Sequence, residues 1–321
     1  MSTRSRRRSA SAPCGLVVGA LAASGALACG GGRPGHGLSS GGGLGGGDAA
    51  MSRAADAQMV HIPAGQFIAG STLEERAAAY DAFLASAGHD GARERGWFER
   101  EADRHLDDLP AFALDLAPVT QAQYGEFVAA TGHRAPTMDQ ATWKAQGFVQ
   151  DWASEVARYV WTEATPPPGR EQHPVVLVSW DDAGAYCAWR GELVGSARRL
   201  PSAAELEKAA RGAGGLIYPW GNGWDATALN SAVAGPGDTV PVGSHRPGGD
   251  WAVLDLAGNV FQWTSTPWPI DAGAAAPARA VKGSAWDDHA GVGRGASIHG
   301  RPRQARHVIV GFRCAGPVGA E

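Results

Sequence analysis

The stretch Asp255-Leu256-Ala257-Gly258-Asn259-Val260-Phe261-Gln262-Trp263 places a carboxylate, two amide side chains and two aromatic rings within nine residues. Apolar residues stand on both sides of Gly258 and Asn259, which supply the backbone freedom that a tight reversal needs. Their spacing is typical of short buried segments and not of a repeating helix. We therefore predict that this turn lies at the centre of the core.

Length and charge limit the classes of protein to be considered. The chain has 321 residues and a formal net charge of -4. The first fifty or so residues differ in composition from the rest, which leaves a folding unit of about 265 residues that we expect to form one domain. Its arginines are scattered and form no basic stripe, which argues against nucleic-acid binding as the main function.

The N-terminus has the pattern of an export signal, with a basic segment at 4–8, an apolar segment at 16–27 and small residues before Cys29. We predict a signal peptide at 1–28, a glycine-rich tether at 29–57 and a folded domain at 58–318. The residues before Cys29 resemble a bacterial lipobox, which predicts lipidation of Cys29; the alternative is an ordinary cleaved signal peptide. The apolar run is too short to span a membrane. Either way, we expect the domain to act outside the cytoplasm, in the cell envelope or as a secreted protein.

Two cysteines remain in the predicted domain, Cys187 and Cys314. In an oxidising compartment a disulfide is the natural interpretation. A bond between them would close a loop of more than about a hundred residues, which would stabilise the domain by about 4 to 5 kcal/mol in the chain-entropy model. A catalytic cysteine is the alternative, but the residues around Cys187 are typical of a helix interior and offer no base.

Local patterns predict the elements of the domain. A hairpin is expected at 59–71, turning at Pro63-Ala64-Gly65. Helices are expected at 72–87, at 121–131 with Thr120 as its cap, from Asp181 or Asp182 to 189, and from Ser202 to 211. Strands are expected at 112–116 and 175–180, a charged surface segment at 93–108, and a long irregular excursion at 133–172 of the kind that often shapes a binding surface.

Several short motifs, taken in this order, resemble the sulfatase-modifying factor family, whose founding member is the formylglycine-generating enzyme. The resemblance covers nearly all of 59–315. It is carried by Ile62-Pro63-Ala64-Gly65-Gln66-Phe67, Pro118-Val119-Thr120-Gln121, His173-Pro174-Val175-Val176, Val178-Ser179-Trp180-Asp181-Asp182-Ala183, Arg199-Leu200-Pro201, Ala209-Ala210-Arg211-Gly212, Tyr218-Pro219-Trp220-Gly221-Asn222, Gly258-Asn259-Val260 and Gly311-Phe312-Arg313-Cys314.

The resemblance implies a C-type-lectin-like α+β fold with little regular secondary structure, a disulfide at the positions of Cys187 and Cys314, and a peptide groove near Phe261, Ser284 and Trp286. The family's enzyme oxidises a sulfatase cysteine to formylglycine with copper and oxygen, and it uses two cysteines beyond a Gly-Gly-Ser motif.

Counted from Ser284, the positions of those two cysteines hold Asp287 and Val292. Neither side chain can supply the thiolates that copper(I) prefers, so we do not expect copper here. The serine of that motif is present as Ser284, but a lone serine after a glycine is more often a turn residue than a participant in chemistry.

The resemblance also implies calcium sites. One set maps onto the side chains of Asp255 and Gln262 and the carbonyls of Gly258 and Val260, which are hard oxygen donors. Glutamine stands where the family usually has glutamate, so one negative charge is lost. The alternative is that these side chains only satisfy backbone groups of the turn. A weaker second set would begin at Asn230 and Ser231.

A further group of ionisable residues collects around the family's active-site region: Asp287, Asp288, His289, His299 and His307. It could form a substitute metal centre of nitrogen and oxygen ligands, with Ser284, Asp287 and His289 as candidate catalytic residues. The alternative is a set of solvated loop side chains, because the spacings match no known ligand motif.

Two functional hypotheses follow. The first is a non-oxidase family member that binds a peptide, a glycan or a protein in its groove, with no nucleic-acid partner and no membrane contact beyond a lipid anchor. The second is an enzyme, either a formylglycine-generating oxidase or an oxidase with a replaced metal centre.

Overall fold

A computed structural model describes residues 58–148, 150–269 and 277–318, so the predicted signal peptide, the tether and Cys29 lie outside the described residues. The strands are β1 (Met59–Ile62), β2 (Gly65–Ala69), β3 (His105–Leu109), β4 (Phe112–Asp115), β5 (Phe261–Trp268), β6 (Ala278–Lys282), β7 (Ile298–Pro302), β8 (Val310–Gly311) and β9 (Ala315–Gly316). The helices are α2 (Leu73–Ala87), α3 (Gly91–Glu94), α4 (Gln121–Thr131), α5 (Gln140–Ala145), α6 (Trp180–Val194) and α7 (Ala203–Arg211), with short helical turns η1 (Trp152–Val156), η2 (Ala157–Tyr159) and η3 (Ala226–Ala228). The fold class is α+β, as predicted. None of the helices in these described ranges is long and apolar enough to cross a membrane.

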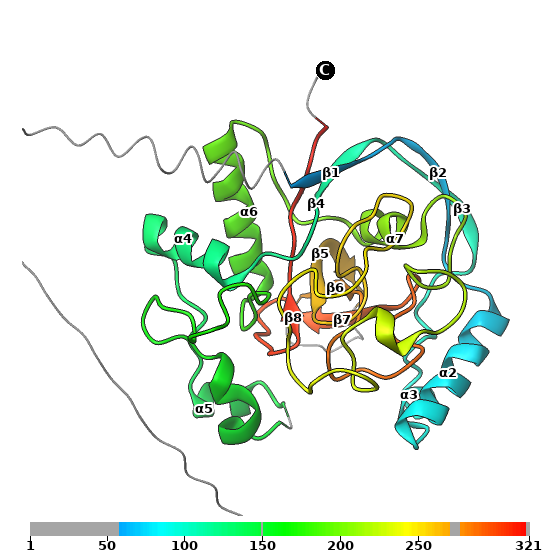
Figure 1. Ribbon diagram of the computed structural model, residues 1–321, viewed down its shortest axis with the longest axis horizontal. Coiled ribbons are helices and arrows are strands. Elements are labelled where there is room, and N and C mark those ends of the chain that lie inside the picture. The colour runs from blue at the N-terminus through cyan, green and yellow to red at the C-terminus, as the bar shows by residue number, and fades with distance from the viewer. Residues whose placement is uncertain (1–57, 149, 270–276, 319–321) are drawn as a thin grey trace, which may run out of the picture. The chain divides into compact units, whose positions relative to one another are not determined.

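A four-stranded sheet with the order β7-β6-β5-β8 occupies the middle of the domain. In the view of Figure 1, α4, α5 and α6 lie to one side of this sheet and α2 and α3 to the other. β5 pairs in parallel with β8, where Phe261 lies opposite Val310, and antiparallel with β6. The turn at 255–260 leads directly into β5, so it stands at the centre of the fold as predicted.

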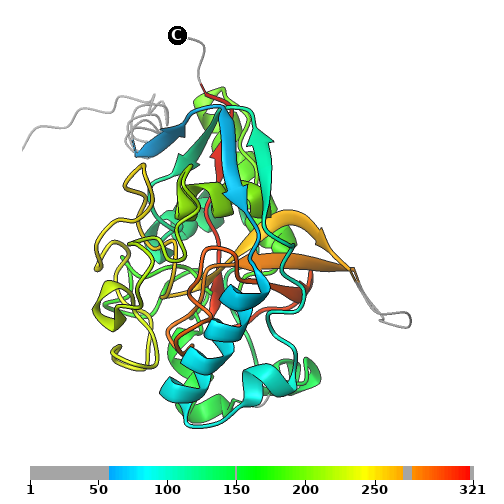
Figure 2. The ribbon, with the colours of Figure 1, turned by 90° about the vertical axis from the view of Figure 1, so that its right-hand side faces the viewer.

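The predicted hairpin at 59–71 is wrong. β1 pairs with β4, and β2 pairs with β3, so the two halves of the segment have different partners (Figure 2). Pro63 lies between β1 and β2, and Pro110 lies between β3 and β4, so each ladder ends at a proline on both of its strands. A proline has no backbone N–H to donate to a ladder, so the paired strands are interrupted on both sides at the same level.

The predicted strand at 175–180 is also wrong. Its apolar residues are buried, but Leu177 has a φ of 60°, which breaks an extended ladder. The backbone N–H of Val175 donates to the carbonyl of Val119, and that of Leu177 donates to the carbonyl of His307. Because several separate segments satisfy this backbone, the run is buried without belonging to a sheet.

The charged segment at 93–108 is only partly a surface segment. Glu101 is buried and forms an ion pair with Arg294 at 2.5 Å, and Phe98 is buried below the Arg294 guanidinium. The segment also contains β3, which the sequence analysis does not predict. Both differences arise from partners far away in the sequence: β3 pairs with β2, and Glu101 pairs with Arg294.

The predicted caps at Thr120 and Ser202 are confirmed, and Thr72 caps α2 in the same way, which was not predicted. Each of the three side chains accepts a hydrogen bond from the backbone N–H three residues on, and the side chain at that third position bonds back. α6 is longer than predicted, because Ser179 forms a further capping box with Asp182 and the helix continues to Val194. Such boxes involve only neighbours in sequence, so they can be predicted without the fold.

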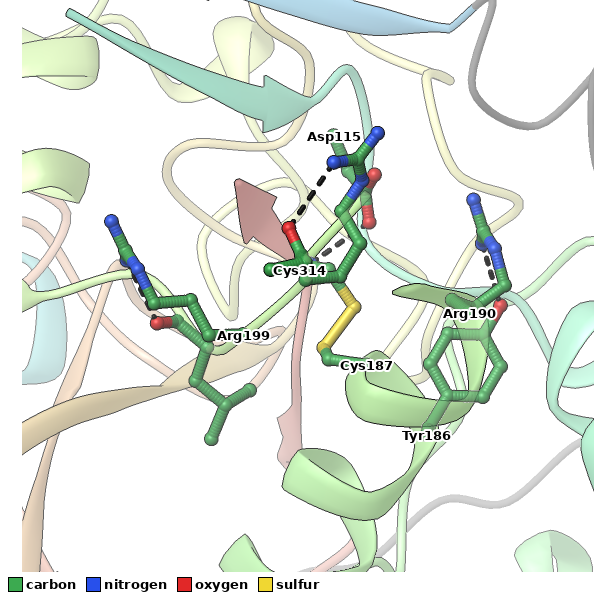
Figure 3. The surroundings of a disulfide bond; sticks show 9 residues. Asp115, Tyr186, Cys187, Arg190, Arg199 and Cys314 are labelled. Atoms are coloured by element: carbon green, nitrogen blue, oxygen red, sulfur yellow. Dashed lines mark hydrogen bonds between the residues drawn. A yellow bond between two sulfur atoms is a disulfide. The ribbon is translucent and has the colours of Figure 1, made fainter. Parts of the chain in front are cut away.

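A disulfide joins α6 to the strand region at the C-terminus. Figure 3 shows Cys187 on the helix and Cys314 beside Asp115, and both sulfur atoms are buried. The backbone N–H of Cys314 donates to the Asp115 carboxylate at 2.8 Å. The predicted disulfide is confirmed, and neither thiol is free to act as a catalytic cysteine.

Candidate functional site

The turn at 255–260 is held by the loop that passes beside it. Gly258 has a φ of 79°, and a Cβ atom there would lie 2.6 Å from the carbonyl oxygen of Asn230. The Asn259 side chain accepts from the N–H of Val240 at 3.0 Å and donates to its carbonyl at 3.1 Å. Only glycine fits at position 258, and the turn therefore delivers Phe261 to one position at the start of β5.

The predicted calcium ligands of this turn have other partners. Gln262 Oε1 accepts a hydrogen bond from Arg313 Nε at 2.5 Å, and Asp255 Oδ2 accepts from the N–H of Gly243 at 2.7 Å. The carbonyl of Gly258 accepts from the N–H of Val260 at 2.8 Å. Arg313 is fully buried, and its guanidinium brings a positive charge to the predicted calcium position. These residues, as arranged, do not fit a calcium ion.

The residues of the second predicted calcium set are partly engaged within their own loop. Asn230 Nδ2 donates to the carbonyl of Asp238 at 2.8 Å, and the Ser231 carbonyl accepts from the N–H of Gly235 at 2.7 Å. Gly235 packs so closely that a Cβ atom there would lie 2.1 Å from Asn230 Oδ1. Asp238, the nearby carboxylate, is paired with Arg170. Asn230 Oδ1, however, is buried and accepts no hydrogen bond from the described residues, so this second calcium site stays a prediction.

A cavity of about 500 Å³ lies where the family resemblance places the active site. Phe261 on β5, the loop after β6 and strand β7 supply its walls, together with two segments from the N-terminal half. Its lining is aromatic and charged: Trp97, Phe148, Gln150, Phe261, Asp287, Asp288, His299, Arg301 and His307 take part. A concave apolar site with a few converging polar groups is the usual form of a small-ligand site.

Two adjacent carboxylates give this cavity its electrostatic character. Burial raises the pKa of Asp287 to about 6. Burial raises the pKa of Asp288 well above its ordinary value, and repulsion from Asp287 adds to the effect. Asp288 Oδ2 accepts from the N–H of Ala285 at 2.8 Å, whereas Asp287 Oδ1 is buried and has no hydrogen-bond partner among the described residues.

The two histidines of the cavity are neutral packing residues. Burial lowers the pKa of His299 and that of His307 to about 3 each. His299 lies edge-on to Trp97 and to Phe261, and His307 Nδ1 accepts from the N–H of Ile309 at 3.3 Å. They add no positive charge at neutral pH.

The predicted metal centre is not assembled. Asp287, Asp288, His299 and His307 all line the cavity, but His289 packs against Phe83 on α2 and does not. Over the described ranges there is no group of three or more His, Cys, Asp or Glu side chains that could hold a metal ion. Neighbouring positions in a loop turn their side chains in different directions, which spacing in the sequence cannot show.

Of the other predicted site residues, one lines the cavity and three do not. Phe261 lines the cavity, as its proposed role in a groove requires. Ser284 does not, because its Oγ accepts from the N–H of Gly258 at 2.8 Å and braces the turn. Trp286 is buried beside Arg158, whose guanidinium carbon lies 5.6 Å from its ring, and Val292 is fully buried in the core.

Among the aromatic, amide and charged residues that line the cavity, Trp97, Phe148, Gln150 and Arg301 were not predicted from the sequence. Trp97 comes from the charged segment at 93–108, and Phe148 and Gln150 come from the excursion at 133–172. The signal available in the sequence was the presence of aromatic residues within these polar segments, such as the pair Trp97 and Phe98. Nothing in the sequence marked Arg301.

The raised pKa of Asp287 predicts a stabilised variant. Asparagine keeps the shape and removes the buried charge, so we expect Asp287→Asn to raise the free energy of unfolding at about pH 7.5 by about 1 to 3 kcal/mol. The folded-state pKa lies above the ordinary value, so the wild type regains stability as the pH falls through about 6. The difference between the two proteins should therefore shrink toward about pH 4. Urea unfolding at several pH values measures it.

The control is Asp108→Asn, which removes an exposed carboxylate from β3. We expect it to change the free energy of unfolding by less than about 0.5 kcal/mol at every pH. An Asp287→Asn protein less stable than the wild type at neutral pH would contradict the assignment of a buried, uncompensated charge.

Comparisons with known proteins match most of this chain to one family. Residues 48–317 match the Sulfatase-modifying factor enzyme 1-like domain. The chain is 30% identical over 307 residues to the Mus musculus protein named Inactive C-alpha-formylglycine-generating enzyme 2, with 84% of this chain and 89% of that protein covered. It is 30% identical over 256 residues to the Formylglycine-generating enzyme of Mycobacterium tuberculosis, with 65% and 74% covered.

Solved structures show the same fold. The structure of PvdO from Pseudomonas aeruginosa matches with a TM-score of 0.60 and 23% identity, over 81% of this chain and 94% of that one. CarF matches with a TM-score of 0.55 and 20% identity, over 81% and 98%. With its central sheet, its disulfide and a domain match that spans most of its length, this chain belongs to the sulfatase-modifying factor family.

Proposed function

We propose that this chain is an exported, non-oxidase member of its family that binds a ligand in the cavity beside Phe261. One observation carries the proposal: the two positions that the resemblance assigns to copper thiolates hold Asp287 and Val292. Val292 is fully buried in the core, and the two cysteines of the described domain are joined to each other. Copper(I) prefers soft thiolate ligands, and a carboxylate with an isopropyl group cannot replace them.

The cavity itself supports a binding role. It is concave, it has aromatic walls, and Asp287 Oδ1 and Gln150 Oε1 are buried acceptors without a donor in the described part of the chain. Buried polar atoms are normally satisfied, so acceptors left open inside a cavity favour a ligand that donates to them. The name of the mouse relative, which calls that protein inactive, is consistent with the loss of oxidase chemistry. Export and a lipid anchor at Cys29 are part of this proposal.

An oxidase assay tests the proposal. We expect the purified chain, incubated with copper(I), oxygen and a peptide carrying a sulfatase cysteine motif, to form no aldehyde detectable by mass spectrometry. The Mycobacterium tuberculosis relative, run in parallel, serves as the positive control. Calorimetric titrations with copper(I) and iron(II) should show no tight binding.

Aldehyde formation by this chain, or tight capture of copper(I), would overturn the proposal and restore the oxidase hypothesis. Tight binding of iron(II) would instead support an oxidase with a replaced metal centre. In that case Asp287→Asn should abolish the iron heat, because Asp287 is one of the carboxylates open to the cavity.

A further inference from the structure

We propose that the cavity beside Phe261 holds an organic cation, an alkylammonium or guanidinium group, against the carboxylate of Asp287. This inference rests on the proposed binding function and names the chemical class of its ligand. Three features of the cavity carry it: its excess of acidic groups, its open hydrogen-bond acceptors and its aromatic walls.

Acidic groups outnumber basic ones around the cavity. Asp287 and Asp288 both line it, and Glu155 on η1 adds a third carboxylate close enough to repel Asp287. Arg301 is the positive side chain that faces them, and both cavity histidines are neutral. Arg301 donates to the carbonyl of Gly300 and forms no ion pair with any carboxylate in the ranges described. The carboxylates therefore lack a counter-ion in contact with them, and buried charges normally have one.

The open acceptors have the polarity that a cation needs. Asp287 Oδ1 and Gln150 Oε1 are buried, and neither accepts a hydrogen bond from the residues that the structure describes. Both residues line the cavity. An ammonium group offers three N–H donors and a guanidinium offers five, whereas a carboxylate or phosphate ligand offers none. An anion would leave both acceptors unpaired.

The aromatic walls provide a second kind of contact for a cation. Phe261, Trp97 and Phe148 line the same cavity as the carboxylates. The guanidinium carbon of Arg301 already lies 5.8 Å from the centre of the Phe261 ring, which is within the range of a cation–π contact. A ligand cation placed between this ring and Asp287 would gain both interactions, and Arg301 would oppose it by like charge.

Calorimetry on the purified full chain tests the inference with four capped amino-acid amides. The probes are N-acetyl-lysine methylamide, N-acetyl-arginine methylamide, the neutral norleucine analogue and the anionic glutamate analogue. We expect the better of the two cations to bind about tenfold or more tightly than the norleucine analogue, and the glutamate analogue to bind no better than norleucine. A fifth probe, 1,5-diaminopentane, distinguishes the source of the cation, since tighter binding of the diamine would indicate a free amine and weaker binding a peptide side chain.

Two variants should shift the cation affinity in opposite directions. Asp287→Asn should weaken it about tenfold or more, because it removes the contacting charge. Arg301→Gln should strengthen it severalfold, because it removes the opposing charge. Asp108→Asn, which changes an exposed residue of β3, should leave it unchanged. A purely structural role for Asp287 and Arg301 would not produce effects of opposite sign.

Three results would overturn the inference: equal binding of the lysine, arginine and norleucine probes, tighter binding of the glutamate probe, or no measurable binding of any cation. Misfolding cannot imitate the expected loss, because Asp287→Asn is expected to be more stable than the wild type at neutral pH. Failure here would leave the copper assay unaffected, so it is distinguishable from failure of the proposed non-oxidase function.

Discussion

A chain in which Cys187 and Cys314 are both replaced by alanine is expected to lose about 3 to 5 kcal/mol of its free energy of unfolding. The disulfide spans 127 residues, and a loop of that length corresponds to about 5 kcal/mol in the chain-entropy model, of which proteins often deliver less. The bond also fixes α6 to the segment between β8 and β9, where both sulfur atoms are buried. Urea unfolding of the variant and the wild type measures the change.

A reducing agent provides the matched control. Unfolding the wild type in the presence of dithiothreitol should reproduce most of the loss, whereas the alanine variant should not respond to it. A loss below about 1 kcal/mol would mean that the packing of α6 holds the C-terminal strands without the covalent link.

Arg313→Met is expected to destabilise the domain by about 3 to 5 kcal/mol. The guanidinium is fully buried and donates to Gln262 Oε1 at 2.5 Å and to the carbonyls of Leu254 and Asp255 at 2.7 and 3.0 Å. It also donates to two carbonyls at the end of β4. Methionine fills a similar volume but satisfies none of these acceptors, and each buried acceptor left unpaired costs about 1 to 3 kcal/mol.

The control for that experiment is Arg303→Met. Arg303 pairs with the Asp181 carboxylate, but both side chains are substantially exposed to solvent. Exposed ion pairs contribute about 0 to 1 kcal/mol, so this variant should unfold close to the wild type. Equal effects of the two substitutions would show that Arg313 acts through general packing and not through its buried hydrogen bonds.

The cavity beside Phe261 combines a cost in stability with a candidate function. The pKa values of Asp287 and Asp288 are raised because both carboxylates are buried without a contacting cation. Groups that destabilise the folded protein are common where binding requires them. If Asp287→Asn both stabilises the domain and weakens cation binding, the two measurements together identify a site retained for function.

The predicted residues of this site show what neighbouring positions in a sequence do not reveal. Asp287 and His289 stand two residues apart, yet one faces the cavity and the other packs on Phe83. Gln150 and Arg301, which face the cavity, come from segments that carry no recognisable motif. The calcium prediction depended on residue types, and it does not fit because Arg313 donates to the glutamine oxygen that a cation would need.

The sequence by itself determined the features that depend on near neighbours: the capping boxes at Thr72, Thr120 and Ser202, the glycine-pivoted turn at Gly258, and the family to which these motifs point. Tertiary structure alone decided the pairing of β1 with β4, the burial of Glu101 with Arg294, and the membership of the cavity. The physical reason is how far apart the interacting residues lie along the chain. A cap forms between residues three apart, whereas a strand partner, a counter-ion or a cavity wall is chosen by packing among segments that many different chain paths could bring together.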